Sequence, residues 1–119
     1  MKYGDLPRLF LAEIPGFEAS PEFALIAGDS DLPGVVVAAV GRYLVRLEQS
    51  GAEDSEAQAP SAIYDIVERM ANSDDPEVQN ALQVELFWNL DPTRSMTRRI
   101  VGKLGPNSSA LYSDWAEAN

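Results

Sequence analysis

The chain has 119 residues, of which 19 are acidic and 9 are basic, so its formal net charge is −10 at pH 7. Hydrophobic residues make up 45% and charged residues 24%, which is typical of one globular domain and too apolar for a disordered acidic tail. The absence of cysteine and histidine excludes disulfides, thiolate and imidazole chemistry and the commonest zinc sites. We therefore expect a binding protein and not an enzyme, with no cofactor or metal.

The first residues of the chain do not resemble a secretion signal. They carry Asp5 and Pro7, and their apolar stretch, Leu9 to Ala12, is too short for the core of a signal peptide. No apolar run approaches the roughly eighteen residues that a membrane span needs. These observations predict a cytoplasmic protein that makes no membrane contact.

The excess of negative charge bears on the choice of partner. An acidic surface repels a phosphate backbone, so nucleic acid is not expected as a ligand. A basic protein is the natural partner for such a surface. The alternative is that the charge only keeps the chain soluble.

Proline recurs where the helical periodicity of apolar residues begins. It is tolerated at the first helical position, because its missing N–H would have no partner there, and a preceding Ser or Asp can cap the free amides. Helix starts are predicted at Ser20-Pro21, Leu32-Pro33, Ala59-Pro60, Asp75-Pro76, Asp91-Pro92 and Gly105-Pro106. Ser20, Asp75 and Asp91 are the expected N-caps. We predict an all-α fold over residues 1–119, a compact single-domain bundle or short curved stack of six or seven helices.

The longest predicted helix covers Pro33 to Gln49. One face of it carries the apolar residues Val36, Val40, Tyr43, Leu44 and Leu47. The β-branched run near its start would also suit a buried strand, so a strand over Val35 to Val40 is the alternative. We favour the helix, because its period continues through seventeen residues.

An acidic segment separates this helix from the next. Residues 50–59 are small and polar, have little to bury, and are predicted to form a flexible loop. The acids of this loop are Glu53, Asp54 and Glu56. A second amphipathic helix is predicted from Ser61 to Asn72, in which Asp65 and Arg69 form a favourable pair one turn apart.

The segment Pro76 to Leu90 is apolar around most of its circumference, which predicts a helix at the centre of the fold. Its polar strip consists of Gln79, Asn80 and Gln83. Glu85 falls between the apolar flanks, where a carboxylate needs a partner. The expected partner is Arg69, Arg98 or Arg99. A less favoured alternative makes Glu85 a general acid or base in a hydrolase.

Two more helices are predicted, from Pro92 to Leu104 and from Pro106 to about Ala116. The first carries a basic stripe of Arg94, Arg98, Arg99 and Lys103. Because no aromatic residues are interleaved with it, the stripe is expected to pair with acidic neighbours inside the protein and not with nucleic acid. Trp88 and Trp115 are expected in the core, or as anchors for a partner if they are exposed.

Three stretches of the sequence are distinctive in combination. They are Phe10 to Phe17, Ile66 to Ser73 running into Asp75 to Leu82, and Leu104-Gly105-Pro106 followed by Leu111. In these stretches the chain resembles a family of small helical bacterial proteins, largely uncharacterised, that includes proteins regarded as immunity proteins of toxin systems. The resemblance covers most of the chain, implies the helical fold and implies no catalytic residue. Nuclease toxins tend to be basic, so an acidic relative would be steered towards such a toxin and would cover it.

The leading hypothesis is a protein that neutralises a cationic partner, such as a toxin domain, by occlusion. The expected contact residues are carboxylates of two segments taken to be neighbours, Glu53, Asp54, Glu56, Asp74, Asp75 and Glu77. The last three lack the ligand spacing of a calcium loop, and helix capping is the simpler reason for Asp75 and Glu77. The alternative is a helical scaffold or self-associating subunit.

Overall fold

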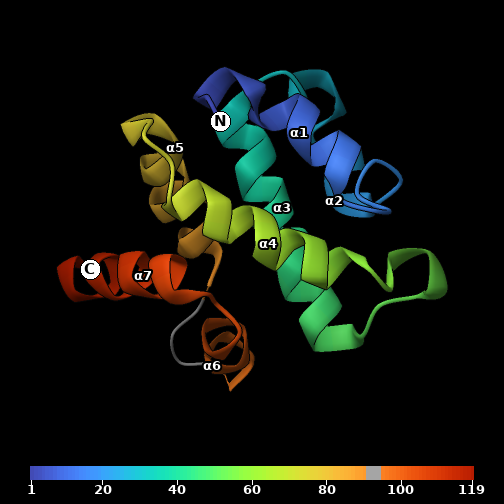
Figure 1. Ribbon diagram of the computed structural model, residues 1–119. Helices are drawn as coiled ribbons and strands as arrows, with labels where there is room; N and C mark the ends of the chain where they lie inside the picture. Colours follow the sequence, from blue (N-terminus) through green and yellow to red (C-terminus); the bar gives the residue numbers. More distant parts are fainter. Residues whose placement is uncertain (91–94) are drawn as a thin grey trace.

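A computed structural model describes residues 1–90 and 95–119, which form seven α-helices and no strand (Figure 1). The α-helices are α1 (Leu6–Glu13), α2 (Pro21–Ala24), α3 (Pro33–Ser50), α4 (Ala59–Ala71), α5 (Pro76–Ala81), α6 (Ser95–Gly102) and α7 (Pro106–Ala118). Three short 3-10 turns cover Tyr3–Asp5, Ala27–Asp29 and Asp54–Glu56. α5 continues into a π-helical turn, Leu82–Leu86, and a 3-10 turn, Phe87–Asn89. The predicted all-α class is confirmed.

Proline and side-chain caps begin the helices as the sequence predicts. Among the described helices, α1 to α5 and α7 all have proline in their first turn. Ser20 Oγ accepts a hydrogen bond from the Phe23 amide at 3.1 Å, and Asp75 Oδ1 accepts one from the Glu77 amide at 3.0 Å. Both predicted caps are therefore confirmed. The expected start at Asp91-Pro92 lies outside the described residues.

α3 is the central element, since it contacts α1, α2, α4, α6 and the π-helical turn. Its buried face includes all five residues predicted for it, Val36, Val40, Tyr43, Leu44 and Leu47. The strand alternative for residues 35–40 is wrong, because the helical period carries one apolar face of α3 through the core over its whole length.

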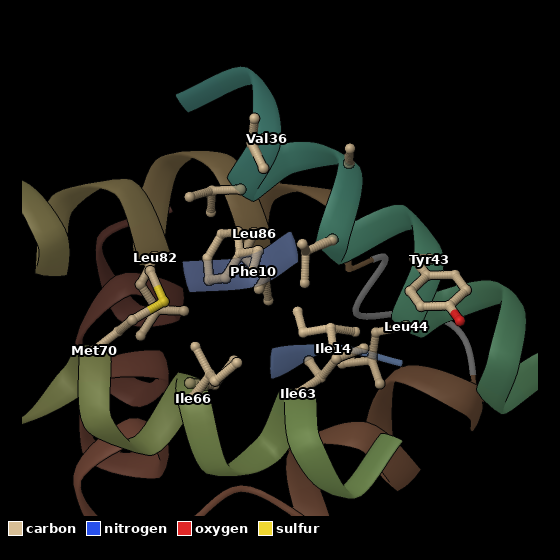
Figure 2. Packing of buried hydrophobic residues seen from close by; sticks show 14 of the residues in the cluster. Phe10, Ile14, Val36, Tyr43, Leu44, Ile63, Ile66, Met70, Leu82 and Leu86 are labelled. Carbon is tan, nitrogen blue, oxygen red and sulfur yellow. The ribbon is translucent and has the colours of Figure 1, made fainter. Parts of the chain in front are cut away.

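The core lies between α3 and α4, and α1 fills it from the side (Figure 2). Phe10 of α1 and Ile14, directly after α1, point between the two longer helices. The side chains that they meet belong to α4 and the π-helical turn, and include Ile63, Ile66, Met70 and Leu86. Each of these six residues is at most 3% exposed. Because burying a side chain of this size contributes roughly 1.5–3 kcal/mol, this core fixes the helices relative to one another.

Residues 76–90, which begin with α5, are not the uninterrupted α-helix that the sequence predicts. Their backbone widens into the π-helical turn where it crosses α3. At the crossing, a Cβ added to Gly41 would lie 3.3 Å from the carbonyl oxygen of Leu86 and 3.4 Å from its Cα. Gly41 therefore lets the two backbones approach closely. Single π turns are local adjustments within helices, and the spacing of apolar residues does not signal this one.

The solvent face of this segment also differs from the prediction. Val84 and Trp88 are 45% and 69% exposed, so the expectation of a core position is wrong for Trp88. Gln79 and Gln83 point to neighbouring backbone: the Gln79 side chain donates to the Ala71 carbonyl at 3.0 Å and the Gln83 side chain to the Leu111 carbonyl at 3.3 Å. These two side-chain amides thus attach the segment to α4 and α7, and Val84 and Trp88 face solvent instead.

α7, at the left of Figure 1, and α6, at the bottom, complete the bundle. Tyr112 of α7 is buried, and its ring meets Phe87 edge to face at 5.2 Å. Trp115 lies one turn further along α7 and is half-buried. Within the described residues, every helix is too short or too polar to cross a membrane.

Candidate functional site

The two groups of carboxylates predicted to bind a partner lie at opposite ends of α4 (Figure 1). Glu53 and Asp54 are exposed in the segment before α4, and Asp74 and Glu77 are exposed just after it. The 13 residues of α4 make a helix about 20 Å long. The expectation that the two groups are neighbours is therefore wrong, because a whole helix separates them.

Glu56 lies inside the protein and not on its acidic surface. Only 8% of the residue is exposed, and its carboxylate accepts a hydrogen bond from Arg46 at 2.9 Å. The same guanidinium binds Glu22 through two hydrogen bonds of 2.8 and 3.1 Å. Hydrogen bonding to Arg46 holds the pKa of Glu56 below its usual value. The prediction that Glu56 is exposed as a contact residue is therefore wrong, because Glu56 is the internal partner of Arg46.

These three residues, Glu22, Arg46 and Glu56, form the Arg46 cluster, which a buried tyrosine extends. The Tyr43 hydroxyl donates to the Pro15 carbonyl at 3.1 Å, and its ring lies 5.3 Å from the Arg46 guanidinium carbon. Burial, followed by the charge of Glu56, raises the pKa of Tyr43 to about 12. Gly16 has a φ of +77°, and a Cβ there would lie 2.9 Å from the Tyr43 hydroxyl. The cluster thus joins α2, α3 and two connecting segments.

Asp75 has a structural role at the start of α5. One carboxylate oxygen caps the helix, and the other accepts a hydrogen bond from the Tyr3 amide at 2.9 Å. The backbone hydrogen bonds from Tyr3 and Glu77 hold the pKa of Asp75 below its usual value. Of the three carboxylates predicted here, Asp74 and Glu77 remain on the surface.

Glu85 is half-buried, and its carboxylate lies against the start of α3. A Cβ added to Gly34 would be 3.3 Å from Glu85 Oε1 and 3.3 Å from the Tyr3 hydroxyl. The side-chain amide of Asn89 donates to the Glu85 backbone carbonyl at 2.6 Å. This position does not bring the carboxylate to any of the three arginines expected to neutralise it.

Arg69, one of those arginines, pairs with α1 instead. It binds Glu13 at 2.8 Å and Asp65 at 3.6 Å. The predicted pair between Asp65 and Arg69 is confirmed, and the predicted pair between Arg69 and Glu85 is wrong. The physical reason is that Arg69 projects from α4 towards α1, whereas Glu85 belongs to the segment that crosses α3.

Among the described residues, the basic stripe forms an ion pair through Lys103. Lys103 binds Glu48 at 2.7 Å, and the Glu48 side chain is only 6% exposed. Arg98 and Arg99 are exposed, and neither makes an ion pair with another described residue. Arg94 lies outside the described residues. Internal pairing is therefore confirmed for Lys103.

Glu68 has a role that sequence reasoning missed. Its carboxylate accepts four hydrogen bonds from the first turn of α7: from the Asn107 amide and side chain at 2.9 and 3.0 Å, and from the Ser108 amide and hydroxyl at 2.9 and 2.8 Å. Burial alone would raise the pKa of Glu68, but the hydrogen bonds from Ser108 and Asn107 lower it below its usual value. Glu68 therefore caps α7 from α4. A Cβ at Gly105 would lie 2.6 Å from its carboxylate, so the glycine makes room for this cap.

The ion pairs leave much of the negative charge at the surface. Arg46 and Arg69 each hold two carboxylates, and Lys103 holds one. The exposed acidic residues of the described chain that lie outside its ion pairs are Glu18, Asp29, Asp31, Glu53, Asp54, Asp74, Glu77, Asp114 and Glu117. Over residues 1–90 and 95–119, no three acidic side chains are grouped so as to hold a metal ion.

Fold and surface together define a small acidic all-α domain held by internal ion pairs and carboxylate caps. The chain belongs to the DUF7674 family, a domain of unknown function, whose sequence profile matches residues 7–117. No curated protein and no solved structure shows significant similarity to the chain. The family match covers nearly the whole sequence.

Proposed function

We propose that this chain is a non-enzymatic binding protein that engages a basic protein, in the manner of a bacterial immunity protein that covers a toxin domain. One observation supports the proposal most directly: three cations, Arg46, Arg69 and Lys103, pair with only five carboxylates, and a surplus of negative charge is exposed outside those pairs. Such a surface attracts a cationic partner over distances of about a Debye length and speeds its association.

The segment before α4 is the first contact that this proposal assigns. It projects beyond one end of α4 (Figure 1) and presents Asp54 and Glu53 to solvent. Glu56 cannot contribute there, because Arg46 holds it inside the Arg46 cluster. Charge on a projecting segment steers an encounter without disturbing the core.

The first experiment is affinity capture of the tagged protein from a lysate of its own cells, with elution by a salt step and identification by mass spectrometry. A basic protein that is released by salt is the expected result. Recovery of the tagged protein alone, with its neighbouring genes expressed, contradicts the proposal.

The second experiment tests the assigned contact with the captured protein. Asp54→Lys should lower the association rate constant about threefold to tenfold at low salt, and the effect should vanish at high salt. The matched control is Asp29→Lys, which makes the same charge change at an exposed position between α2 and α3. Asp54 is preferred over Glu53 because the Glu53 side chain takes part in the capping box of its turn. Equal slowing by both variants would remove the segment from the interface.

A second candidate function, a self-associating scaffold, draws on the exposure of Val84 and Trp88. It predicts a molar mass that rises with concentration in sedimentation equilibrium and returns to the monomer value in Trp88→Ala. A concentration-independent monomer contradicts it.

A further inference from the structure

An exposed aromatic surface lies away from the segment before α4. We call it the tryptophan patch, and it consists of Val84, Trp88 and Trp115. Trp88 is 69% exposed, and its ring meets Trp115 edge to face at 6.3 Å. An exposed tryptophan at a protein surface is unusual, and tryptophan is among the residues that most often dominate binding energy.

The patch is held from beneath by other rings. Trp115 stacks on Tyr112 at 5.8 Å and lies 6.1 Å from Phe87, and Phe87 meets Tyr112 edge to face at 5.2 Å. Phe87 and Tyr112 belong to the buried core. Trp88 is therefore the outer member of an aromatic cluster that is anchored in the core. A side chain preorganised in this way loses less conformational entropy on binding than a free surface side chain does.

The charges of α7, the helix that carries Trp115, favour a cationic occupant. Asp114 and Glu117 are exposed on this helix. α7 contains no lysine or arginine over Pro106–Ala118. The faces of tryptophan rings attract cations, and a planar guanidinium stacks on them better than an ammonium group does.

We propose that the tryptophan patch is a docking site for an arginine-bearing segment of a basic protein. The guanidinium lies over Trp88, and Asp114 and Glu117 attract it from α7. This inference rests on the proposed function, since it assigns the partner's anchoring point to a surface other than the segment before α4.

A second copy of the chain fits the patch less well. Two molecules of net charge −10 repel each other. A stable dimer buries roughly 800 Å² on each partner, whereas an aromatic side chain offers roughly 150–250 Å². Three side chains, of which only Trp88 is mostly exposed, suit a short segment better than a globular face.

The test uses nuclear magnetic resonance, because the chain has only two tryptophans and their indole N–H signals report on the patch directly. The probe is a capped heptapeptide with three arginines, and the control peptide carries neutral citrulline at the same positions. The arginine peptide should shift both indole signals in a saturable manner at low salt, and the citrulline peptide should not. Trp88→Ala should weaken binding about fivefold or more, as loss of a cation–π contact implies.

Two further variants complete the test, one as a control and one for the acidic residues of α7. Leu25→Ala removes another exposed apolar side chain, 81% exposed after α2, and should leave the affinity unchanged. The double variant Asp114→Asn/Glu117→Gln should weaken binding about threefold and reduce its salt dependence. Both acids are exposed, so this variant remains informative even if Trp88→Ala were to unfold.

Several results would overturn the inference. Unchanged affinity in both patch variants, or equal binding of the citrulline peptide, excludes the patch as a site for arginine. If the arginine peptide shifts only the amides around Asp54, the inference fails while the proposed function stands. If a dimer forms and dissociates in Trp88→Ala, the patch binds a second copy. If no peptide binds and no basic protein is captured, both proposals fail.

Discussion

Two carboxylates near opposite ends of α4 find their hydrogen-bond partners by different means. Glu56, just before the helix, is neutralised by the guanidinium of Arg46. Glu68, close to its other end, has no cation among its hydrogen-bond partners and is held instead by the amides and side chains of Asn107 and Ser108. Both arrangements lower the pKa of the carboxyl group.

The difference shows how a chain with 9 basic and 19 acidic residues satisfies its inner carboxylates. Cations are scarce, so one arginine serves both Glu22 and Glu56. At Glu68 the free N–H groups at the start of α7 take the place of a cation, because a helix N-terminus carries partial positive charge. The first arrangement links α2 and α3 to a connecting segment, and the second fixes α7 on α4.

The largest effect is expected where the cation is removed. Arg46→Met leaves the carboxylates of Glu22 and Glu56, whose side chains are 12% and 10% exposed, without a partner. It should lower the free energy of unfolding by about 2 to 3 kcal/mol, measured by urea denaturation, because breaking a buried pair strands its charges. Arg42→Met, a half-buried position of α3, is the control. Equal losses in the two variants would show that the ion pairs do not stabilise the fold.

The carboxylate cap should be the next most sensitive. Glu68→Ala leaves the first turn of α7 without its acceptors, one of which serves the fully buried Ser108. We expect a loss of about 2 kcal/mol in the same urea measurement. Glu68→Gln keeps one acceptor oxygen and should lose about half as much. If α7 keeps its amide hydrogen-exchange protection in Glu68→Ala, the cap is not what fixes this helix.

The two carboxylates should also respond to acid. Their folded pKa values lie below the ordinary value of 4.5, so the unfolded chain binds more protons in mild acid. The stabilisation is fully present above pH 4.5 and is lost as the pH falls through the folded values. Each extra proton bound by the unfolded chain contributes a slope of about 1.4 kcal/mol per pH unit. Urea titrations from pH 6 to 3 should therefore give a shallower decline in Glu68→Gln, and a parallel decline would contradict the assignment.

The smallest effect is expected at an exposed pair. Asp65 is 71% exposed in its side chain and lies 3.6 Å from Arg69, which binds Glu13 more closely. Asp65→Asn should change the free energy of unfolding by only a few tenths of a kcal/mol. If Asp65→Asn lowers the free energy of unfolding as much as Glu68→Ala does, the exposure of a carboxylate in this chain does not indicate how much it contributes to stability.

The parts of the fold that depend on local signals could be predicted, and those that depend on distant partners could not. Proline at the start of α3, α5 and α7 and the caps Ser20 and Asp75 are read from adjacent residues. Glu68 gives no such signal, because its partners lie 39 and 40 residues further along the chain. The spacing of Glu53 and Glu56 does match a capping box and could have shown that Glu56 serves its own turn.

Residues 76–90 illustrate the limit of periodicity. Counting apolar residues predicts a helix at the centre of the fold, yet the count does not say which side faces the neighbours. Gln79 and Gln83, one turn apart, are a usable signal, since amides at that spacing can serve two backbone carbonyls. The exposed position of Trp88 follows once those amides face inward.

The contact between Trp88 and Trp115 also decides what an optical experiment can see. Both fluorophores that dominate the emission of this chain stand at one junction, between α7 and the segment after α5. Intrinsic fluorescence therefore reports the detachment of α7, whereas far-ultraviolet circular dichroism averages over every helix. Superimposable melting curves from the two methods would mean that the domain unfolds cooperatively. An earlier fluorescence transition would identify α7 as a separate unit of lower stability.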